Sequence, residues 1–223
     1  MPDYININYE IIAVWKEFPT ECCDKIPLLF PPSEEGCVLF ISFNPSFPDE
    51  LKNKKWKHSY EINTLNTINV EQVIKQEIET QNSLRYFNIL KEIARALYLP
   101  WSHLDVFMLR ETSQEKAKPK VYDDAAKRLT RFGQKQFDLF TKALQISTPK
   151  IIVVINALAS EIIKTQLRLK YDSADGCYYA PDENIKAPFF LGSMLSGQRA
   201  MDIYSRERLV WHIRQKLRDM GGI

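Results

Sequence analysis

Two short, almost wholly apolar runs constrain the fold of this chain most. The first is Cys37–Phe43, which lies between Gly36 and an Asn-Pro pair, and the second is Ile151–Ile155, which follows Pro149-Lys150. A short run without alternation of apolar and polar residues is typical of a strand buried on both faces of a parallel sheet. We therefore predict that the two runs are adjacent or near-adjacent parallel strands in one sheet, with helices on both faces.

Helical and extended patterns occupy much of the remaining chain. Apolar residues recur every three or four positions over Leu84–Leu97, which predicts an amphipathic helix that ends before Pro100. Alternating strands and helices indicate βαβ units, in which ligands bind beyond the carboxyl ends of the strands. The other expected elements are a short helix over Ile11–Phe18, an extended connection over Ile26–Pro32, a strand over Leu104–Leu109, a helix over Ala125–Leu144 with a candidate break at Gly133, a helix over Ala157–Leu169, turns over Tyr171–Ala187, a strand over Pro188–Leu191 and a C-terminal helix.

The composition is typical of a globular protein. The chain has 223 residues, of which 45% are hydrophobic, and we predict a single domain over residues 1–223 with an N-terminal helical and extended segment over 1–35. The sequence contains no apolar run of the roughly 18 to 20 residues that a membrane span needs and no signal-peptide pattern, so a cytoplasmic protein is expected, with a monomer favoured. The 30 basic side chains nearly balance 28 acidic ones, so a nucleic-acid footprint would have to be local.

The segment that leaves the first strand carries a motif. Ser42-Phe43-Asn44-Pro45-Ser46 resembles the first motif of the uracil-DNA glycosylase superfamily, in which a small residue, a variable residue, Asp or Asn, and then Pro follow the first core strand. The Asn-Pro pair also suits an ordinary turn. Later segments match in order: Ile151–Ile155 with Asn156-Ala157 resembles the family's penultimate strand-to-helix unit, and Leu191–Arg199 resembles its closing motif. The resemblance, which covers about Gly36–Leu217, implies a three-layer α/β sandwich with a short, mostly parallel central sheet flanked by helices.

The resemblance implies a site that binds a flipped base and hydrolyses its N-glycosidic bond. Such enzymes rotate a damaged base out of the duplex because the bond to be broken is inaccessible inside the stack. Cleavage leaves a cationic sugar and an anionic base, so the site needs a positioned water and hydrogen-bond donors near the base. By resemblance, Asn44 holds that water, and its amide orients water without being an effective base. The closest analogy is with the mismatch-specific and single-strand-selective types that have Asn at this position.

The implied pocket takes its residues from the first and the closing motifs. Phe47 either offers a face on which a base stacks or packs beneath its own loop. The family has His or Asn two positions before the serine of its closing motif, and this chain has Met194 there, whose thioether cannot donate a hydrogen bond to an anionic base. Either Gln198 or Arg199 replaces the missing donor, or Arg199 instead holds a phosphate or forms an ordinary ion pair. The implied pocket residues are Ser42, Phe43, Pro45, Ser46, Phe47 and Met194, and the implied backbone-gripping residues are Ser196, Gly197, Gln198 and Arg199.

Two basic stretches are candidate contacts to a phosphate backbone. In the run Lys52–His58, Lys55 would contact a phosphate while Trp56 stacks on a base, although a solvated loop fits the same residues. The C-terminal helix carries a second basic group, which is diluted by two acidic residues. Its basic residues are Arg206, Arg208, Arg214, Lys216 and Arg218, and its acidic ones are Glu207 and Asp219.

No cofactor or metal is predicted. Cys22 and Cys23 are adjacent and the chain has no CxxC pair, so the cysteines do not suit an iron–sulfur cluster. The three histidines, His58, His103 and His212, have no companion at metal-ligand spacing. The sequence also lacks the Gly-rich loops that bind nucleotide phosphates.

Three functions fit these observations. The leading hypothesis is a base-excision DNA-repair glycosylase, a hydrolase whose activity on uracil is expected to be weak because Met194 supplies no donor. The second is a non-catalytic nucleic-acid or nucleotide-binding module that shares the pocket's shape. The third is an unrelated α/β protein that binds a small metabolite at the same strand ends.

Overall fold

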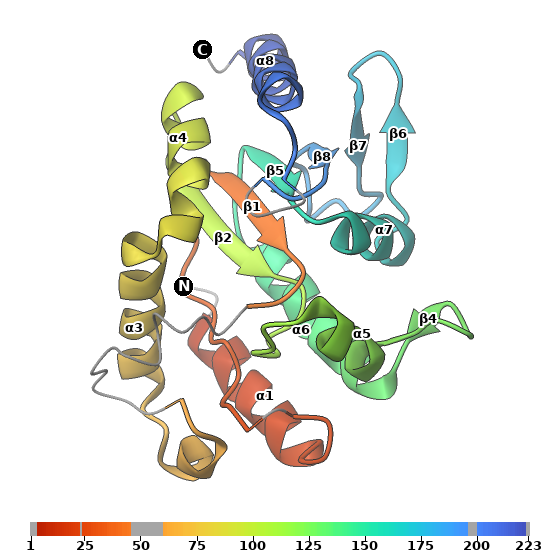
Figure 1. Cartoon of the computed structure of the whole chain (residues 1–223). Coiled ribbons are helices and arrows are strands. Elements are labelled where there is room, and N and C mark those ends of the chain that lie inside the picture. The colour runs from red at the N-terminus through yellow and green to blue at the C-terminus, as the bar shows by residue number, and fades with distance from the viewer. Residues whose placement is uncertain (1–3, 23, 46–59, 196–199, 222–223) are drawn as a thin grey trace. The chain divides into compact units, whose positions relative to one another are not determined.

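The computed structural model describes residues 4–22, 24–45, 60–195 and 200–221 of the chain (Figure 1). These residues form two compact units, each built from three separate segments. We call the first the helical unit, which comprises Met1–Pro32, Phe43–Asn82 and Asp105–Ile146. We call the second the sheet unit, which comprises Ser33–Ser42, Ser83–Leu104 and Ser147–Ile223.

The sheet unit is built on a six-stranded mixed sheet with the strand order β2-β1-β5-β8-β7-β6. Its strands are β1 (Val38–Ser42), β2 (Trp101–Asp105), β5 (Ile151–Val154), β6 (Lys170–Asp172), β7 (Cys177–Tyr179) and β8 (Phe189–Leu191). Its helical elements are η2 (Arg85–Phe87), α4 (Asn88–Ala96), α7 (Ala157–Gln166) and α8 (Ile203–Asp219). The predicted α/β class, with a mostly parallel sheet flanked by helices, is confirmed.

The centre of the sheet is parallel, as predicted for the two apolar runs. β1 pairs with β5 in a register that runs from Val38 opposite Ile151 to Ile41 opposite Val154, and β5 pairs in parallel with β8. Figure 1 shows β2 running in the same direction as its neighbour β1. Every residue of β1 and β5 is buried, which is why neither strand alternates apolar and polar residues.

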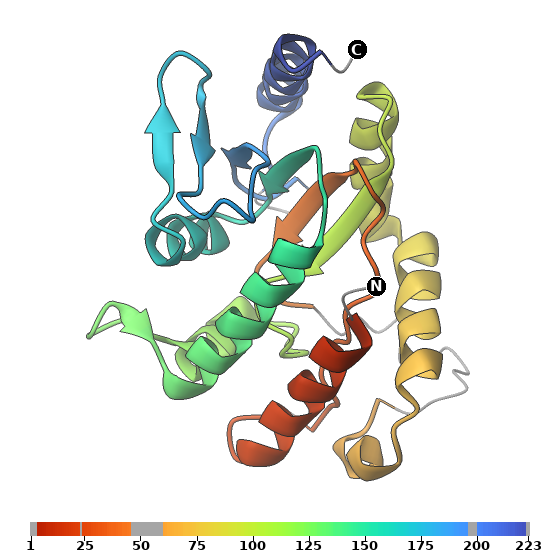
Figure 2. The ribbon, with the colours of Figure 1, turned by 180° about the vertical axis from the view of Figure 1, so that it is seen from behind.

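The helical unit contains most of the remaining elements. They are α1 (Tyr4–Glu17), η1 (Ile62–Thr67), α3 (Val70–Ser83), α5 (Gln114–Val121), β3 (Tyr122–Asp123), β4 (Arg128–Leu129) and α6 (Arg131–Ile146). Helices α1 and α6 lie side by side (Figure 2), and the rings of Trp15 and Phe132 meet between them with centroids 5.3 Å apart. In the described part of the chain, no helix is long and apolar enough to cross a membrane.

The strand predicted over Leu104–Leu109 is wrong in position, because β2 ends at Asp105. Val106 to Leu109 are nonetheless fully buried. The apolar run therefore indicates that the segment is buried, although it does not pair with another strand. Their backbone is satisfied outside any ladder: Met108 N–H donates to Gln136 Oε1 over 2.8 Å, and Met108 O accepts from Leu28 N–H over 2.9 Å.

The helix predicted over Ala125–Leu144 begins later, because β3 and β4 form a hairpin before α6 starts at Arg131. Gly133 does not interrupt α6. It lies in the first turn, where its N–H donates to Thr130 Oγ1 over 3.0 Å, and a Cβ at this position would come within 2.0 Å of Val121 O. A glycine is required there because α6 approaches the end of α5 too closely for any side chain.

The sequence patterns also failed to predict the bounds of other elements, and some elements altogether. Helix α1 begins at Tyr4, seven residues before the predicted Ile11, and helices α3 and α5 were not predicted. The segment interpreted as turns over Tyr171–Ala187 contributes to a hairpin of β6 and β7. Its turn is stabilised by Asp172 Oδ1, which accepts from two backbone N–H groups, and it contains Gly176 with φ of +66°.

Candidate functional site

Asn44 is held by three backbone carbonyls of the helical unit. Its Nδ2 donates to Leu109 O over 3.0 Å, to Glu111 O over 2.7 Å and to Pro45 O over 3.1 Å. Carbonyl oxygens only accept, so this contact set fixes which end of the amide is nitrogen. The oxygen Oδ1 therefore faces away from the three carbonyls, and no described residue donates a hydrogen bond to it.

The loops that follow β1 and β2 along the chain run side by side next to Asn44. Phe107 N–H donates to Phe43 O over 3.0 Å, and the two phenyl rings meet edge to face with centroids 5.1 Å apart. Both rings are buried in the core of the helical unit. Phe43, predicted to line the base pocket, thus packs beneath the loop, while Pro45 is half-buried.

A buried ion pair fixes the segment that accepts the Asn44 hydrogen bonds. Arg110 lies between the two accepting residues, Leu109 and Glu111, and its guanidinium contacts the carboxylate of Glu77 on α3. The two side chains are only 2% and 3% exposed, and the guanidinium also lies 4.5 Å from the ring centroid of Tyr60. Burial raises the pKa of Glu77, and the neighbouring Arg110 opposes that rise. We call Asn44, Leu109, Glu111 and the pair Glu77–Arg110 the Asn44 socket.

Ser42, also predicted to line the pocket, is a core residue of the sheet unit. Its Oγ is hydrogen-bonded to His103 Nε2 on β2 over 3.1 Å, and both residues are buried. Burial lowers the pKa of His103 to about 3, so the imidazole is neutral at physiological pH. A serine beside a histidine is the arrangement of an activated nucleophile. Here the pair joins the neighbouring strands β1 and β2 inside the sheet, without the exposure that a substrate would need.

The strand order places a topological switch point between β1 and β5. Within the sheet, β2 lies next to β1 on one side, and β5, the next strand of this sheet along the chain, lies next to β1 on the other side. In open α/β sheets, ligands bind in the crevice beyond the carboxyl ends of the strands at such a point. Asn44 follows the last residue of β1 by two positions, and Asn156 follows the last residue of β5 by two. Asn156 Oδ1 caps α7 by accepting from Ala159 N–H over 3.0 Å.

The end of β8 leads into the predicted closing motif. Gly192 N–H donates to Val154 O over 2.9 Å, and Met194 O accepts from Met201 N–H over 2.6 Å, so the backbone is fixed on both sides of the motif. The predicted backbone-gripping residues, Ser196–Arg199, lie outside the described residues, as do Ser46, Phe47, Lys55 and Trp56. The predicted cleft between Asn44 and the closing motif therefore stays a prediction.

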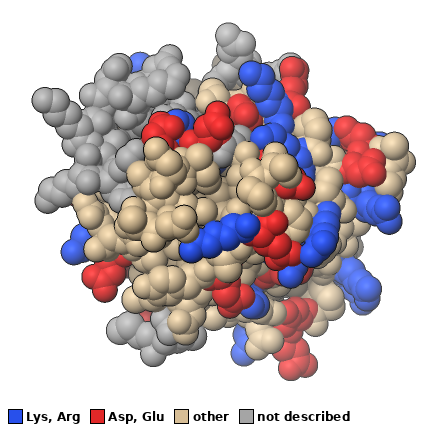
Figure 3. Space-filling view, turned by 90° about the horizontal axis from the view of Figure 1, so that it is seen from below, with Lys and Arg blue, Asp and Glu red and all other residues tan. Residues whose placement is uncertain are grey.

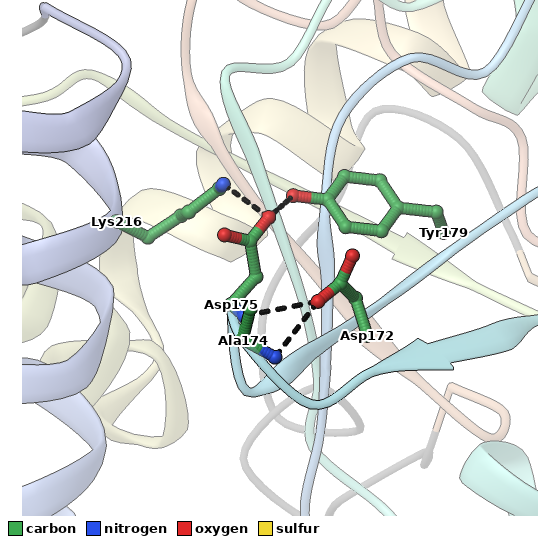
Figure 4. Close-up of polar contacts among 5 residues, drawn as sticks. All are labelled: Asp172, Ala174, Asp175, Tyr179 and Lys216. Atoms are coloured by element: carbon green, nitrogen blue, oxygen red, sulfur yellow. Dashed lines mark hydrogen bonds and ion pairs between the residues drawn. The ribbon is translucent and has the colours of Figure 1, made fainter.

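A second polar cluster, which sequence reasoning missed, joins the β6–β7 hairpin to α8 (Figure 4). Asp175 Oδ2 accepts hydrogen bonds from Tyr179 Oη and from Lys216 Nζ. These donors lower the pKa of Asp175, with Lys216 the larger cause. The Asp-Gly pair at the hairpin turn was the available sequence signal, but the lysine that meets it comes from a helix about 40 residues later.

Charge on the visible surface is mixed. On the face in Figure 3, Lys and Arg side chains are interspersed with Asp and Glu, without a continuous field of one sign. Among the described residues, no group of three or more His, Cys, Asp or Glu side chains is arranged to hold a metal ion. What the Asn44 socket offers chemically is a fixed amide oxygen, an acceptor that can orient a water molecule or a donor group of a ligand.

The buried pair Glu77–Arg110 yields a stability prediction. Glu77→Gln keeps the shape of the side chain but leaves Arg110 buried without its counter-charge, and we expect the free energy of unfolding to fall by about 3–5 kcal/mol. The matched control is Glu17→Gln, which removes the partner of Arg131 from a pair whose side chains are 40% and 78% exposed. That change should cost less than about 1 kcal/mol. Urea denaturation of both variants tests this, and equal losses would contradict a buried, essential pair.

His103 yields a prediction about pH. Its pKa is about 3 in the folded protein against 6.5 for an ordinary histidine, so the unfolded chain binds the proton more readily between these values. The contribution of neutral His103 to the free energy of unfolding should therefore be fully present above pH 6.5 and should be lost as the pH falls from 6.5 toward 3. Between pH 7 and pH 5 this residue should cost about 2 kcal/mol.

The control for that prediction is His103→Gln, which keeps a polar side chain beside Ser42 but cannot titrate. Denaturation at both pH values should give a smaller loss for the variant by about 2 kcal/mol, whatever its stability at pH 7. The same pH dependence in both proteins would show that His103 is not buried in its neutral form.

Comparisons with known proteins assign no family to the chain. It matches no protein-family model and no curated protein.

Proposed function

We propose that this chain is a nucleic-acid-binding protein similar to the uracil-DNA glycosylases, which binds a flipped or modified base and orients a water against its N-glycosidic bond through Asn44. The observation that supports this most is the orientation of the Asn44 amide. Three carbonyls hold Nδ2, and Oδ1, to which no described residue donates, is left as an acceptor on the residue two positions after β1 in the chain. The role requires an acceptor at that position, held before the substrate arrives.

The chemistry of this site differs from that of a carboxylate site. An amide oxygen can accept a hydrogen bond from a water and so orient the lone pair of that water. The amide neither removes a proton effectively nor stabilises a cationic sugar as an aspartate would. An aspartate would also be a poor substitute here, because its carboxylate would face the oxygens of Leu109 and Glu111. The socket is thus matched to asparagine.

The strand order supports a ligand at this end of the sheet. The switch point between β1 and β5 is where doubly wound folds bind their ligands. Nucleotide-binding and metabolite-binding α/β proteins also bind their ligands at such a point, so the strand order supports a location, while the ligand class rests on the motif and on the chemistry of Asn44.

Catalysis is expected to be slow. Met194 stands where the related enzymes have His or Asn, and loss of one preorganised donor commonly costs roughly 10²- to 10³-fold in rate. A second candidate function, base binding without hydrolysis, is favoured by the same residue, since a thioether can line a pocket but cannot donate to a departing base.

The experiment combines a binding titration with an excision assay. Oligonucleotides that contain one uracil, single-stranded and double-stranded, are incubated with the protein, and abasic sites are revealed by alkaline cleavage. We expect binding that weakens at least about tenfold between about 50 and about 200 mM salt, and slow or undetectable excision. Met194→His restores a donor and should raise excision by roughly 10- to 100-fold if hydrolysis occurs at all.

Asn44 variants provide the controls. Asn44→Ala should abolish any excision that Met194→His reveals, while Asn44→Asp should lower the midpoint of thermal unfolding because it sets a carboxylate against two carbonyls. Excision by the unchanged protein at the rate of an efficient glycosylase would refute the expected loss at Met194. Failure to bind any oligonucleotide at low salt would refute the proposal and favour a small metabolite as ligand.

A further inference from the structure

Helix α8 has an inner face that is fully used by contacts within the sheet unit. Ile213 and Leu217 are completely buried, and the ring of His212 lies 5.6 Å from that of Phe190. Lys216 contacts Asp175 of the hairpin, as Figure 4 shows. Arg214 donates to Ala96 O at the end of α4 from both Nε and Nη2, over 3.1 and 2.8 Å. These contacts fix which side of α8 faces outward.

The outward side carries aromatic and basic residues in one stripe. Tyr204 is 69% exposed and Trp211 is 61% exposed, and they are seven positions, or two helical turns, apart. Arg208 lies between them on the stripe and Arg218 lies two turns beyond Trp211, and both are exposed. The acidic residues Glu207 and Asp219 lie at the edges of this side. We call Tyr204, Arg208, Trp211, Gln215 and Arg218 the outer stripe of α8.

We propose that the outer stripe of α8 binds an unpaired strand of nucleic acid, with bases stacked on Trp211 and Tyr204 and phosphates held by Arg208 and Arg218. This deepens the proposed function, on which it rests, by naming the surface that holds the strand. Alternating aromatic and basic side chains are the means by which proteins bind single strands without reading their sequence. Stacking needs exposed ring surface, and Trp211 is 61% exposed, with the centroid of the His212 ring 6.4 Å from its own.

An unpaired strand fits the outer stripe better than a duplex does. Base faces are accessible only when bases are unstacked, whereas a duplex presents phosphates and base edges. The two rings are separated by about 10 Å along the helix axis, since each residue rises about 1.5 Å. This separation exceeds the roughly 3.4 Å between stacked bases, so the two rings hold separate bases of an unstacked strand.

A protein partner fits the outer stripe less well. Helices that dock in protein grooves present apolar anchors at successive i, i+3, i+4 and i+7 positions. Here the positions between and beyond the two aromatic rings are Arg208, Gln215 and Arg218. The outer stripe carries two cations, of which Arg208 also donates from Nη2 to Ser205 Oγ over 3.0 Å, and its carboxylates, Glu207 and Asp219, are confined to the edges. Two cations beside the aromatic rings are complementary to a polyanion.

The experiment measures binding to a single-stranded deoxythymidine oligonucleotide, the matching uridine oligonucleotide and a DNA duplex by fluorescence anisotropy. Trp211→Ala should weaken binding to the single strands about 5- to 100-fold, and Arg218→Gln should reduce the slope of log affinity against log salt by about one. Binding to the duplex should change less than binding to the single strands. The DNA and RNA arms show which sugar the protein prefers.

Two matched variants control for general loss of aromatic area or of charge. Tyr9→Ala removes a tyrosine that is 58% exposed on α1, and Arg128→Gln removes an exposed charge on β4. Both should leave single-strand binding within about twofold of the unchanged protein. Equal losses in control and test variants would overturn the assignment to α8.

The outcomes separate the inference from the proposed function. If the unchanged protein binds single strands and Trp211→Ala binds equally well, the outer stripe is not the site, and base binding near Asn44 still stands. If the unchanged protein binds no strand, both fall. If Trp211→Ala instead dissociates a dimer seen by analytical ultracentrifugation, the outer stripe is an interface between copies of this chain, and the inference is overturned.

Discussion

The backbone oxygens of Leu109 and Glu111 determine what Asn44 can do. They accept the Asn44 Nδ2 hydrogen bonds over 3.0 and 2.7 Å, and they stay in place because Arg110, the residue between them, is paired with Glu77 deep in the helical unit. A charge pair with both partners almost fully buried permits little movement, since separation would leave an uncompensated charge in a medium of low dielectric constant. The rigid pair Glu77–Arg110 therefore fixes the orientation of the Asn44 amide oxygen.

The proposed function has two separate supports, the strand order of the sheet unit and the Asn44 socket of the helical unit. The sheet unit brings β1 and β5 together in an order that, in open α/β sheets, marks where ligands bind, and in the helical unit the socket holds a polar acceptor on the residue two positions after β1 in the chain. Under the proposed function, Met194 would supply no donor to a departing base, so binding is expected to exceed catalysis. The outer stripe of α8 would add affinity for a strand without affecting the bond to be broken.

The sequence predicted the centre of the fold better than its edges. Continuous apolar runs identified β1 and β5 because both strands are buried on both faces, whereas Val106 to Leu109 form an equally apolar run that is buried without pairing. The candidate break at Gly133 is absent from α6, because the glycine is required by its packing against Val121 O, a contact that cannot be read from local sequence. Asn44 was identified from its motif, but the pair Glu77–Arg110 joins residues 33 positions apart and leaves no local pattern.

The most direct test of a base bound at Asn44 is the NMR signal of its side-chain amide in uniformly ¹⁵N-labelled protein. During titration with a short single-stranded oligonucleotide that contains uracil, we expect the Asn44 Nδ2 cross-peak to shift and to saturate with the Kd measured by anisotropy. The backbone signals of Leu109 and Glu111 should change with it, because their carbonyl oxygens accept the Asn44 hydrogen bonds. An unchanged Asn44 amide when the protein is saturated with oligonucleotide would contradict the assignment of this residue to the base-binding site.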